Sequence, residues 1–333
     1  MRMPGRPMKL QQLRYVIEIV RNGNHLSAAA EALSTSQPGV SRQIQQLEAE
    51  LGFDIFVRTR NRIIGLTEPG RKVYESAQQI ATEVAALRSL KEEITAGDRG
   101  TLIVGTTHTQ ARYVLPTVVR NFVKMYPDVS LSLKQGHPEY ACELVDAGEA
   151  DIAVTTETIR EFPRLVKLQC AELNRCVVAK AGHPILSVKE PLTLEAIAEY
   201  PVITYDSHYS GRWKVMRAFK AAGLSPKIIL SAIDADVCKT YVEIGLGIAI
   251  LSSVTFDPVR DLGLGIRDAK HLFEPSPINI SLRANTYLRP FLLDFISAVA
   301  PHLTPGVVRK TLETHRLSQQ AAGQAAKGQS LSE

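Results

Sequence analysis

The sequence predicts a basic, mostly helical N-terminal module, a long connecting helix, and an α/β domain of two lobes. A length of 333 residues suggests two or three domains. The apolar spacing changes from a helical period before residue 95 to alternating strands and helices after Gly100. The net charge of +5 is confined to residues 1–72, which hold 11 Lys and Arg against 6 Asp and Glu, as a polyanion-binding module would.

Composition excludes several classes of protein. Hydrophobic residues make up 45% and charged residues 22%, which is typical of a folded globular chain. The longest apolar run, residues 244–254, is too short to span a membrane, and residues 1–9 lack the apolar core of a signal peptide. We therefore expect a cytoplasmic protein. Its cysteines are scattered without a CxxC pair, so we expect reduced, buried thiols; they are Cys142, Cys170, Cys176 and Cys238.

Three short helices are predicted first. Apolar residues recur at three- and four-residue steps from Leu10 to Val20, and Gly23 ends this helix. Ser27 precedes a compact alanine-rich helix over 28–33. Pro38 enters a third helix, whose apolar face runs from Val40 to Leu51.

A basic hairpin is predicted after the third helix. Short β-type runs at 55–57 and 63–64 flank the basic segment 58–62. Two helices joined by a tight turn and followed by a basic wing form a winged helix-turn-helix, whose second helix enters the DNA major groove. The expected DNA contacts are Gln37, Pro38, Ser41, Arg42 and Gln45 on the third helix, and Arg58, Arg60 and Arg62 in the wing. The alternative is a solvated helix face.

One long helix is predicted over 68–95, between an N-terminal domain of residues 8–67 and the α/β domain. Apolar residues from Val73 to Ile94 follow a heptad pattern that only Lys91 interrupts, which favours a dimerisation helix. The alternative is a helix that packs on its own domain. The glycine-containing segment 96–100 is a plausible hinge.

Residues 100–310 show alternating strands and helices, which predict parallel sheets with crossover helices in two lobes and a cleft between them. Expected strands are 102–105, 129–133, 151–155, 175–180, 202–205, 228–232, 248–251 and 278–282. Expected helices are 111–125, 140–147, 213–222, 235–244 and 287–300. Residues 317–333, rich in Gln, Ala, Gly and Ser, predict a disordered tail.

Hydroxyl and amide side chains gather at the predicted carboxyl ends of strands. Thr107, Thr109 and Gln110 lie where a strand ends and a helix begins, so side-chain groups and free backbone N–H groups meet a positive helix end. Thr156 follows another strand on the same sheet edge, and Ser210 precedes a helix. Crevices at such edges bind ligands, so this pattern predicts an anion site, although ordinary helix capping is the alternative. Thr204 is a weaker candidate.

No catalytic or metal-binding constellation is found. The chain lacks a nucleophile elbow, an HExxH motif and a P-loop, so neither His108 nor Asp151 predicts an enzyme. Asp234 and Asp236 begin a predicted helix, where the helix dipole stabilises negative charge, and we interpret them as structural. We expect no catalytic residue, no metal site and no cofactor.

The N-terminal motifs resemble the DNA-binding domain of LysR-type transcriptional regulators. The residues that carry this are Ser27–Leu33, Thr35–Glu48, Leu51–Gly52, Phe56, Arg58, Leu66–Thr67 and Pro69–Gly70. The resemblance covers residues 8 to about 310. It implies a winged helix-turn-helix, a linker helix and an effector domain of the periplasmic-binding-protein type with two α/β lobes. It also implies promoter DNA and RNA polymerase as partners and a tetramer. The family pattern begins at Met8, so a start at Met1 and a start at Met8 both stay open.

The effector domain resembles the CysB-type branch, which activates sulfur assimilation and cysteine biosynthesis. The residues that carry this are Met8–Tyr15, Thr106–Tyr113, Asn174–Arg175, Asp234–Val237, Lys239–Val242 and Ala300–Thr304. The branch implies that Thr107, Thr109, Gln110, Thr156 and Ser210 bind sulfate or an acetylserine inducer. Ser210 stands where the pattern has threonine, which keeps the hydroxyl and drops a methyl.

Two other functions remain open. A relative in the same branch would control the use of organic sulfur sources and sense adenosine phosphosulfate or sulfate, and both readings need an anion site at Thr107–Gln110. A solute-binding or enzymatic α/β protein with an incidental basic N-terminus is the remote alternative. The absence of an export signal and of a catalytic constellation argues against it.

Overall fold

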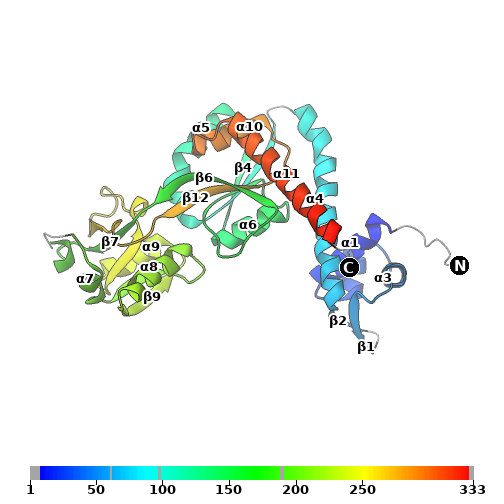
Figure 1. The fold of residues 1–333 in the computed structure, drawn as a ribbon, viewed down its shortest axis with the longest axis horizontal. Helices are drawn as coiled ribbons and strands as arrows, with labels where there is room; N and C mark the ends of the chain where they lie inside the picture. The colour runs from blue at the N-terminus through cyan, green and yellow to red at the C-terminus, as the bar shows by residue number, and fades with distance from the viewer. Residues whose placement is uncertain (1–7, 61, 97–98, 188–190, 330–333) are drawn as a thin grey trace. The chain divides into compact units, whose positions relative to one another are not determined.

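The computed structural model describes residues 8–60, 62–96, 99–187 and 191–329, and it divides into two compact units (Figure 1). The first unit ends at Thr95 and the second begins at Ala96. We describe each unit by itself. The second unit contains two lobes, each built on its own five-stranded sheet.

Three helices form the core of the first unit. They are α1 (Leu10–Arg21), α2 (Leu26–Ala32) and α3 (Gln37–Leu51). Val16, Ile44 and Leu47 are almost fully buried between them, as the apolar spacing predicted. The Ser36 hydroxyl accepts the Gly39 N–H at 3.3 Å and so caps α3, and Gly52 ends the helix at a φ of 80° that suits glycine.

The start of the second helix differs from the prediction. Ser27 lies inside α2, and His25 is at the capping position without a side-chain cap. The Ser27 hydroxyl instead donates to the side-chain oxygen of Gln37 at 3.0 Å, so it joins α2 to the first turn of α3.

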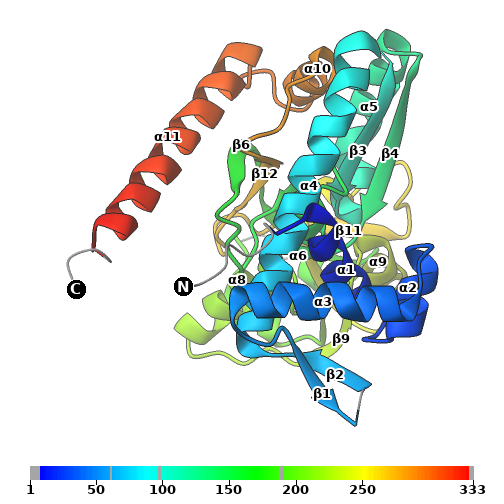
Figure 2. The same cartoon turned by 90° about the vertical axis from the view of Figure 1, so that its right-hand side faces the viewer.

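A two-stranded hairpin follows α3 and projects beside it (Figure 2). Its antiparallel strands are β1 (Phe56–Thr59) and β2 (Arg62–Leu66). The buried Glu48 carboxylate accepts the Ile55 and Phe56 N–H groups at 2.9 and 3.2 Å, which holds the first strand against α3. The helix-turn-helix and wing predicted from the sequence are therefore present.

Helix α4 (Glu68–Ala96) is longer by one residue than the predicted linker helix. Thr67 caps it, because its hydroxyl accepts the Gly70 N–H at 2.9 Å. Of the heptad positions with described side chains, Ala77 is buried in the first unit. Ile80 and Leu87 are 38% and 70% exposed, so this part of the seam does not pack on its own unit. The side chains of Lys91 and Ile94, and residues 97–98 of the proposed hinge at 96–100, lie outside the described residues.

The first lobe of the second unit has strand order β4-β3-β5-β12-β6. Its strands are β3 (Gly100–Thr106), β4 (Val129–Gln135), β5 (Ile152–Thr156), β6 (Leu165–Leu173) and β12 (Ser276–Arg283). Helices α5 (Leu115–Met125) and α10 (Pro290–Val299) cover one face and α6 (Pro138–Asp146) covers the other (Figure 1). A π-helical turn, η1 (Gln110–Val114), leads from β3 into α5.

The second lobe has strand order β11-β7-β10-β8-β9. Its strands are β7 (Arg175–Lys180), β8 (Val202–Tyr205), β9 (Ile228–Ala232), β10 (Ile248–Ser252) and β11 (Leu264–Asp268). Helices α7 (Leu194–Ala198) and α8 (Ser210–Ala221) pack on one face, and α9 (Ala235–Glu243) packs on the other. Short 3₁₀ turns occupy Pro184–Leu186 and Ser253–Thr255.

The predicted parallel pairing is present for β3 with β4 and β5 and for β8 with β9 and β10, but both sheets are mixed. In the first lobe β12 pairs antiparallel with β5 and β6, and in the second β7 pairs antiparallel with β10 and β11. The reason is that the chain crosses between the lobes twice, at β6–β7 and β11–β12, and each crossing brings in a strand of opposite direction. Strands β6 and β11 and helix α7 were not predicted.

The expected tail differs as well. Residues 317–329 form the end of α11 (Pro305–Gln329), and 330–333 lie outside the described residues. Alanine and glutamine favour helix, and no proline interrupts this stretch. Val308 and Leu312 anchor the first half of α11 in the core of the first lobe.

Candidate functional site

The exposed side of α3 gathers the polar residues that the sequence singled out. Gln37, Pro38, Arg42 and Gln45 are exposed, and Ser41 is half-buried. The opposite face, with Val40, Ile44 and Leu47, holds the helix in the core. The helix therefore presents a row of hydrogen-bonding side chains on a rigid support, which is the arrangement that reads base edges.

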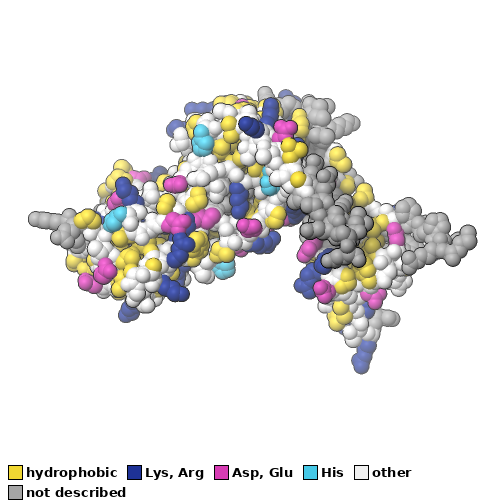
Figure 3. All heavy atoms as spheres, in the orientation of Figure 1, with side chains coloured by type: hydrophobic (Ala, Val, Ile, Leu, Met, Phe, Trp, Pro, Cys, Tyr) yellow, Lys and Arg dark blue, Asp and Glu magenta, His cyan; other side chains and the backbone are white. Residues whose placement is uncertain are grey.

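The wing adds positive charge, and Lys and Arg atoms mark its tip (Figure 3). Arg60 and Arg62 are exposed and available for phosphates. Arg58 differs, because its guanidinium forms an ion pair with the buried Glu48 at 2.8 Å. Arg58 thus fastens the wing to α3 and is a weaker candidate for a DNA contact than its two neighbours.

Thr107 and Thr109 lie between β3 and η1, and Gln110 is the first residue of η1, at the carboxyl end of the first-lobe sheet. The Thr107 hydroxyl donates to the side-chain oxygen of Gln110, and both residues are almost fully buried. The neighbouring Thr106 hydroxyl donates to the Val154 carbonyl at 2.9 Å, which fixes the end of β3 against β5. The loop is therefore held from both sides, and π-helical turns such as the one that follows it recur at functional sites.

The predicted residues of the two lobes meet. The Ser210 hydroxyl, at the first turn of α8, donates to the Thr156 hydroxyl at the end of β5 at 3.3 Å. Thr204 is fully buried in β8, and its hydroxyl has no hydrogen-bond partner among the described residues. Carboxyl edges of both sheets thus face one lobe junction.

Tyr205 and Arg175 also belong to this junction, and the sequence analysis did not assign them a role there. Burial raises the pKa of Tyr205, while the charge of Arg175 acts in the opposite direction. The two residues lie 30 positions apart in the chain. A tyrosine or an arginine in a predicted strand does not indicate from the sequence which distant residue it will contact.

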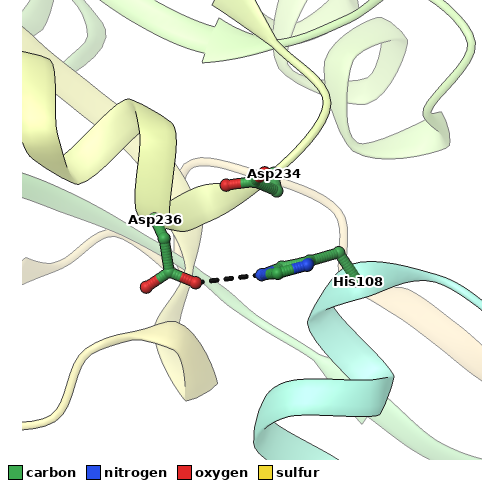
Figure 4. Close-up of side chains that lie close together, drawn as sticks. All are labelled: His108, Asp234 and Asp236. Atoms are coloured by element: carbon green, nitrogen blue, oxygen red, sulfur yellow. Dashed lines mark hydrogen bonds and ion pairs between the residues drawn. The ribbon is translucent and has the colours of Figure 1, made fainter. Parts of the chain in front are cut away.

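A second cluster joins the lobes beside this loop, as Figure 4 shows for His108 and Asp236. Asp236, in the first turn of α9, accepts from His108 Nε2 at 3.0 Å and from the Tyr113 hydroxyl at 2.7 Å, and it pairs with Arg112 at 2.8 Å. Lys239 in α9 donates to the Tyr113 hydroxyl at 3.0 Å. Asp236 therefore connects the loop of the first lobe to α9 of the second.

The charges in this cluster determine its chemistry. Desolvation alone would raise the pKa of Asp236, but hydrogen bonds from Tyr113 and His108 and the charges of Lys239 and Arg112 outweigh it, so the pKa is lowered. His108, Asp234 and Asp236 have metal-ligand spacing. Arg112 and Lys239 already neutralise the charge of Asp236. Asp234 caps α9, since its carboxylate accepts the Val237 N–H at 2.8 Å. We therefore interpret the cluster as a contact between the lobes.

The remaining side chains singled out by sequence have structural partners. Asp151 accepts the Ile103 N–H at 2.7 Å and pairs with Arg289, as a group that holds β3 would. The four cysteines are free thiols, and Cys142, Cys176 and Cys238 are buried. Among the described residues no helix is long and apolar enough to cross a membrane.

Comparison with known families identifies both parts of the chain. Residues 10–71 match the bacterial regulatory helix-turn-helix family of LysR proteins, and residues 95–304 match the LysR substrate binding domain. The chain is 45% identical over 296 residues to the transcriptional regulator SsuR of Burkholderia cenocepacia, which covers 89% of this chain and 96% of that protein. It is 43% identical over 306 residues to the regulator CysB of the same organism, with 92% and 97% covered.

Solved structures agree. The cofactor-binding domain of the Cbl transcriptional regulator is 34% identical, with a TM-score of 0.61, and the match covers 64% of this chain and 93% of that one. Full-length CbnR in complex with its target DNA shares the fold, with a TM-score of 0.60 at 23% identity over 88% of this chain and 99% of that one. The fold class and the family resemblance predicted from sequence are confirmed. The matched families and relatives are transcriptional regulators, which agrees with the expectation that this protein is a regulator and not an enzyme. The chain belongs to the LysR family of DNA-binding transcriptional regulators.

Proposed function

We propose that this regulator controls genes of sulfur assimilation and cysteine biosynthesis and responds to an acetylserine-type inducer or sulfate at the lobe junction. The observation that carries the proposal is the Ser210–Thr156 contact, because two predicted anion-binding hydroxyls from separate lobes meet there. Thr107, Thr109 and Gln110 would supply further hydrogen bonds to the anion, beside the start of η1. Similarity to CysB at 43% identity supports the pathway.

The second candidate function is control of organosulfur use, with adenosine phosphosulfate or sulfate as the signal. Similarity to SsuR at 45% identity favours it about as much as similarity to CysB favours the first. The two candidates share the fold and the anion site, so only the ligand separates them.

On DNA, α3 would read bases through Arg42, Ser41 and Gln37, and Arg60 and Arg62 would bind phosphates. The exposed apolar residues Ile80 and Leu87 of α4 support pairing of two protomers through this helix. A tetramer would then need a second interface in the effector domain. The regulator would act in the cytoplasm, with RNA polymerase as its partner at the promoter.

A ligand can shift the balance between two arrangements of the lobes only by its difference in affinity for them. A ligand bound to Thr107–Gln110 on one side and to Thr156 and Ser210 on the other would favour the closed arrangement. Because Asp236 joins the same loop to α9, this closure would also move α9.

The test is the melting temperature of the full chain against sulfate, N-acetylserine, O-acetylserine and adenosine phosphosulfate. A ligand at 100 times its Kd stabilises the protein by about 2.7 kcal/mol, which moves the melt by several degrees. A shift with acetylserine supports the cysteine pathway, and a shift with adenosine phosphosulfate alone supports the second candidate. No shift with any of the four would contradict both.

A further inference from the structure

Arg175 carries a buried charge for which no ion pair is found within the part of the chain that the structure describes. It begins β7, where the chain first crosses from one lobe to the other, and it is 3% exposed. The guanidinium donates to the Ser276 hydroxyl at 2.7 Å and makes a long bond to the Leu173 carbonyl at 3.5 Å. Its Nε atom has no hydrogen-bond partner among the described residues. A guanidinium stays protonated in proteins, so the charge remains.

The position of this charge points to a ligand. The guanidinium lies against the first turn of α8, since a Cβ atom on Gly211 would be 2.7 Å from its Nη2 atom. Glycine at this position lets the guanidinium approach the helix. The helix start adds unpaired N–H groups and a partial positive charge. Ser210, which contacts Thr156 across the junction, stands in the same turn.

The neighbouring carboxylates form ion pairs with other cations. Glu157 interacts with Arg175 through its charge, but its ion pair is with Lys214, whose side chain is 4% exposed, and its two oxygens have no hydrogen-bond partner among the described residues. Glu274 pairs with Arg217 and, at 3.6 Å, with Lys214. Arg217 and Glu274 are both exposed and balance each other at the surface, so the buried and half-buried groups are Arg175 and Lys214 against Glu157, which leaves one positive charge at the junction. A buried charge without a partner destabilises the folded protein, so this position favours the binding of an anion.

We propose that Arg175 is the residue that selects negative charge in the effector: an anion at the first turn of α8 completes the charge balance. This inference rests on the effector site proposed above and adds the residue that determines specificity. Sulfate, carboxylate and phosphate groups fit, whereas a neutral compound with the same oxygen atoms does not. Because Ser276 begins β12 in the second crossing, the Arg175–Ser276 bond also ties the two connecting segments to the anion.

The test uses the full chain and inorganic sulfate at constant ionic strength. Arg175→Gln removes the charge and keeps an N–H donor for Ser276. We expect its sulfate Kd to rise at least about tenfold and its melting temperature without sulfate to stay equal or increase. Arg175→Lys should recover most of the sulfate response, because it restores the charge.

Arg217→Gln is the matched control. Arg217 lies in the same helix, is exposed and pairs with Glu274, so its loss changes the net charge equally but should leave sulfate binding unchanged. It also corrects for the general stabilisation of proteins by sulfate.

The outcomes separate the two proposals. A normal sulfate response in Arg175→Gln would overturn the role of Arg175 and leave the effector site standing. A lower melting temperature or a failure to fold without sulfate would also overturn it, because the charge would then stabilise the empty domain. If the wild-type chain responds to an acetylserine and not to sulfate, the same variants are compared against that carboxylate, and an unchanged response in Arg175→Gln would overturn the inference alone. No response to any of the anions would overturn both.

Discussion

The reading face of α3 and the lobe junction of the effector domain present polar residues in opposite ways. On α3 the side chains Gln37, Arg42 and Gln45 are exposed and lie outside the core, although Gln37 accepts a hydrogen bond from Ser27. At the junction Thr107, Gln110 and Ser210 are buried and contact other side chains. The first surface is ready to bind without rearrangement, whereas a ligand at the second must replace existing contacts. Substitutions on the exposed surfaces should therefore change binding alone, and substitutions of buried groups should also change stability.

The largest effect is expected on the exposed seam of α4. Leu87→Glu places a carboxylate at an apolar heptad position of each protomer and should weaken self-association at least about hundredfold, while the stability of the single protomer stays unchanged because Leu87 is 70% exposed in it. Analytical ultracentrifugation measures the dissociation. Gln79→Glu, which adds the same charge at an exposed position outside the seam, is the control, and equal association of the two variants would exclude the seam as an interface.

Glu48 is a buried polar group in the DNA-binding unit, so its substitution should change stability as substitutions at the lobe junction do. Glu48→Gln removes the charge that holds the Ile55 and Phe56 N–H groups and Arg58, so the wing should lose about 2 kcal/mol of stability. Faster hydrogen exchange at Ile55 and Phe56 would report this loss. Glu50→Gln, at an exposed carboxylate, should leave exchange unchanged, and equal rates in both variants would refute the role of Glu48.

Arg42→Ala should lower specific DNA affinity by about 1 to 3 kcal/mol and leave the melting temperature and the ligand response intact, since the side chain is exposed. The measurement is binding to DNA that the wild-type protein selects from a random pool. Arg21→Ala, at an arginine that pairs with Glu18 on α1, is the control. Unchanged affinity in Arg42→Ala would remove Arg42 from the reading surface.

Asp236 should give the smallest effect, which depends on pH. Its pKa is lowered in the folded state, so its contribution to stability is complete above the ordinary pKa of an aspartate and is lost as the pH falls through the lower folded value. Asp236→Asn should therefore cost about 1 kcal/mol at neutral pH and flatten the loss of stability in acid. Chemical unfolding at several pH values measures both, and parallel curves for variant and wild type would contradict the assigned network.

The contrast between the two regions also explains what the sequence could predict. The faces of α3 follow from local periodicity, because Val40, Ile44 and Leu47 repeat at helical spacing and leave the polar residues outside. The carboxyl edges that carry Thr107 and Thr156 follow from strand order. The contacts of Arg175 with Ser276 and of His108 with Asp236 join positions about 100 to 130 residues apart, and no local pattern encodes them.

The missed and misjudged elements have local causes. Gly263 precedes β11 and Gly265 lies in it, and glycine lowers the strand propensity of this segment. The backbone hydrogen bonds with β7 stabilise the strand despite its low propensity. The end of α11 has the composition of a flexible tail, yet alanine and glutamine continue a helix that Val308 and Leu312 have already anchored. Arg58 resembled a phosphate contact because its partner Glu48 lies in a different element.

The most direct test of the account measures the DNA affinity of the full chain with and without the ligand that shifts its melt. Wild-type affinity should change at least about fivefold, whereas Thr107→Ala combined with Thr109→Ala should keep the unliganded affinity and lose the change. The same response in both proteins would contradict the claim that a ligand at the lobe junction controls DNA binding.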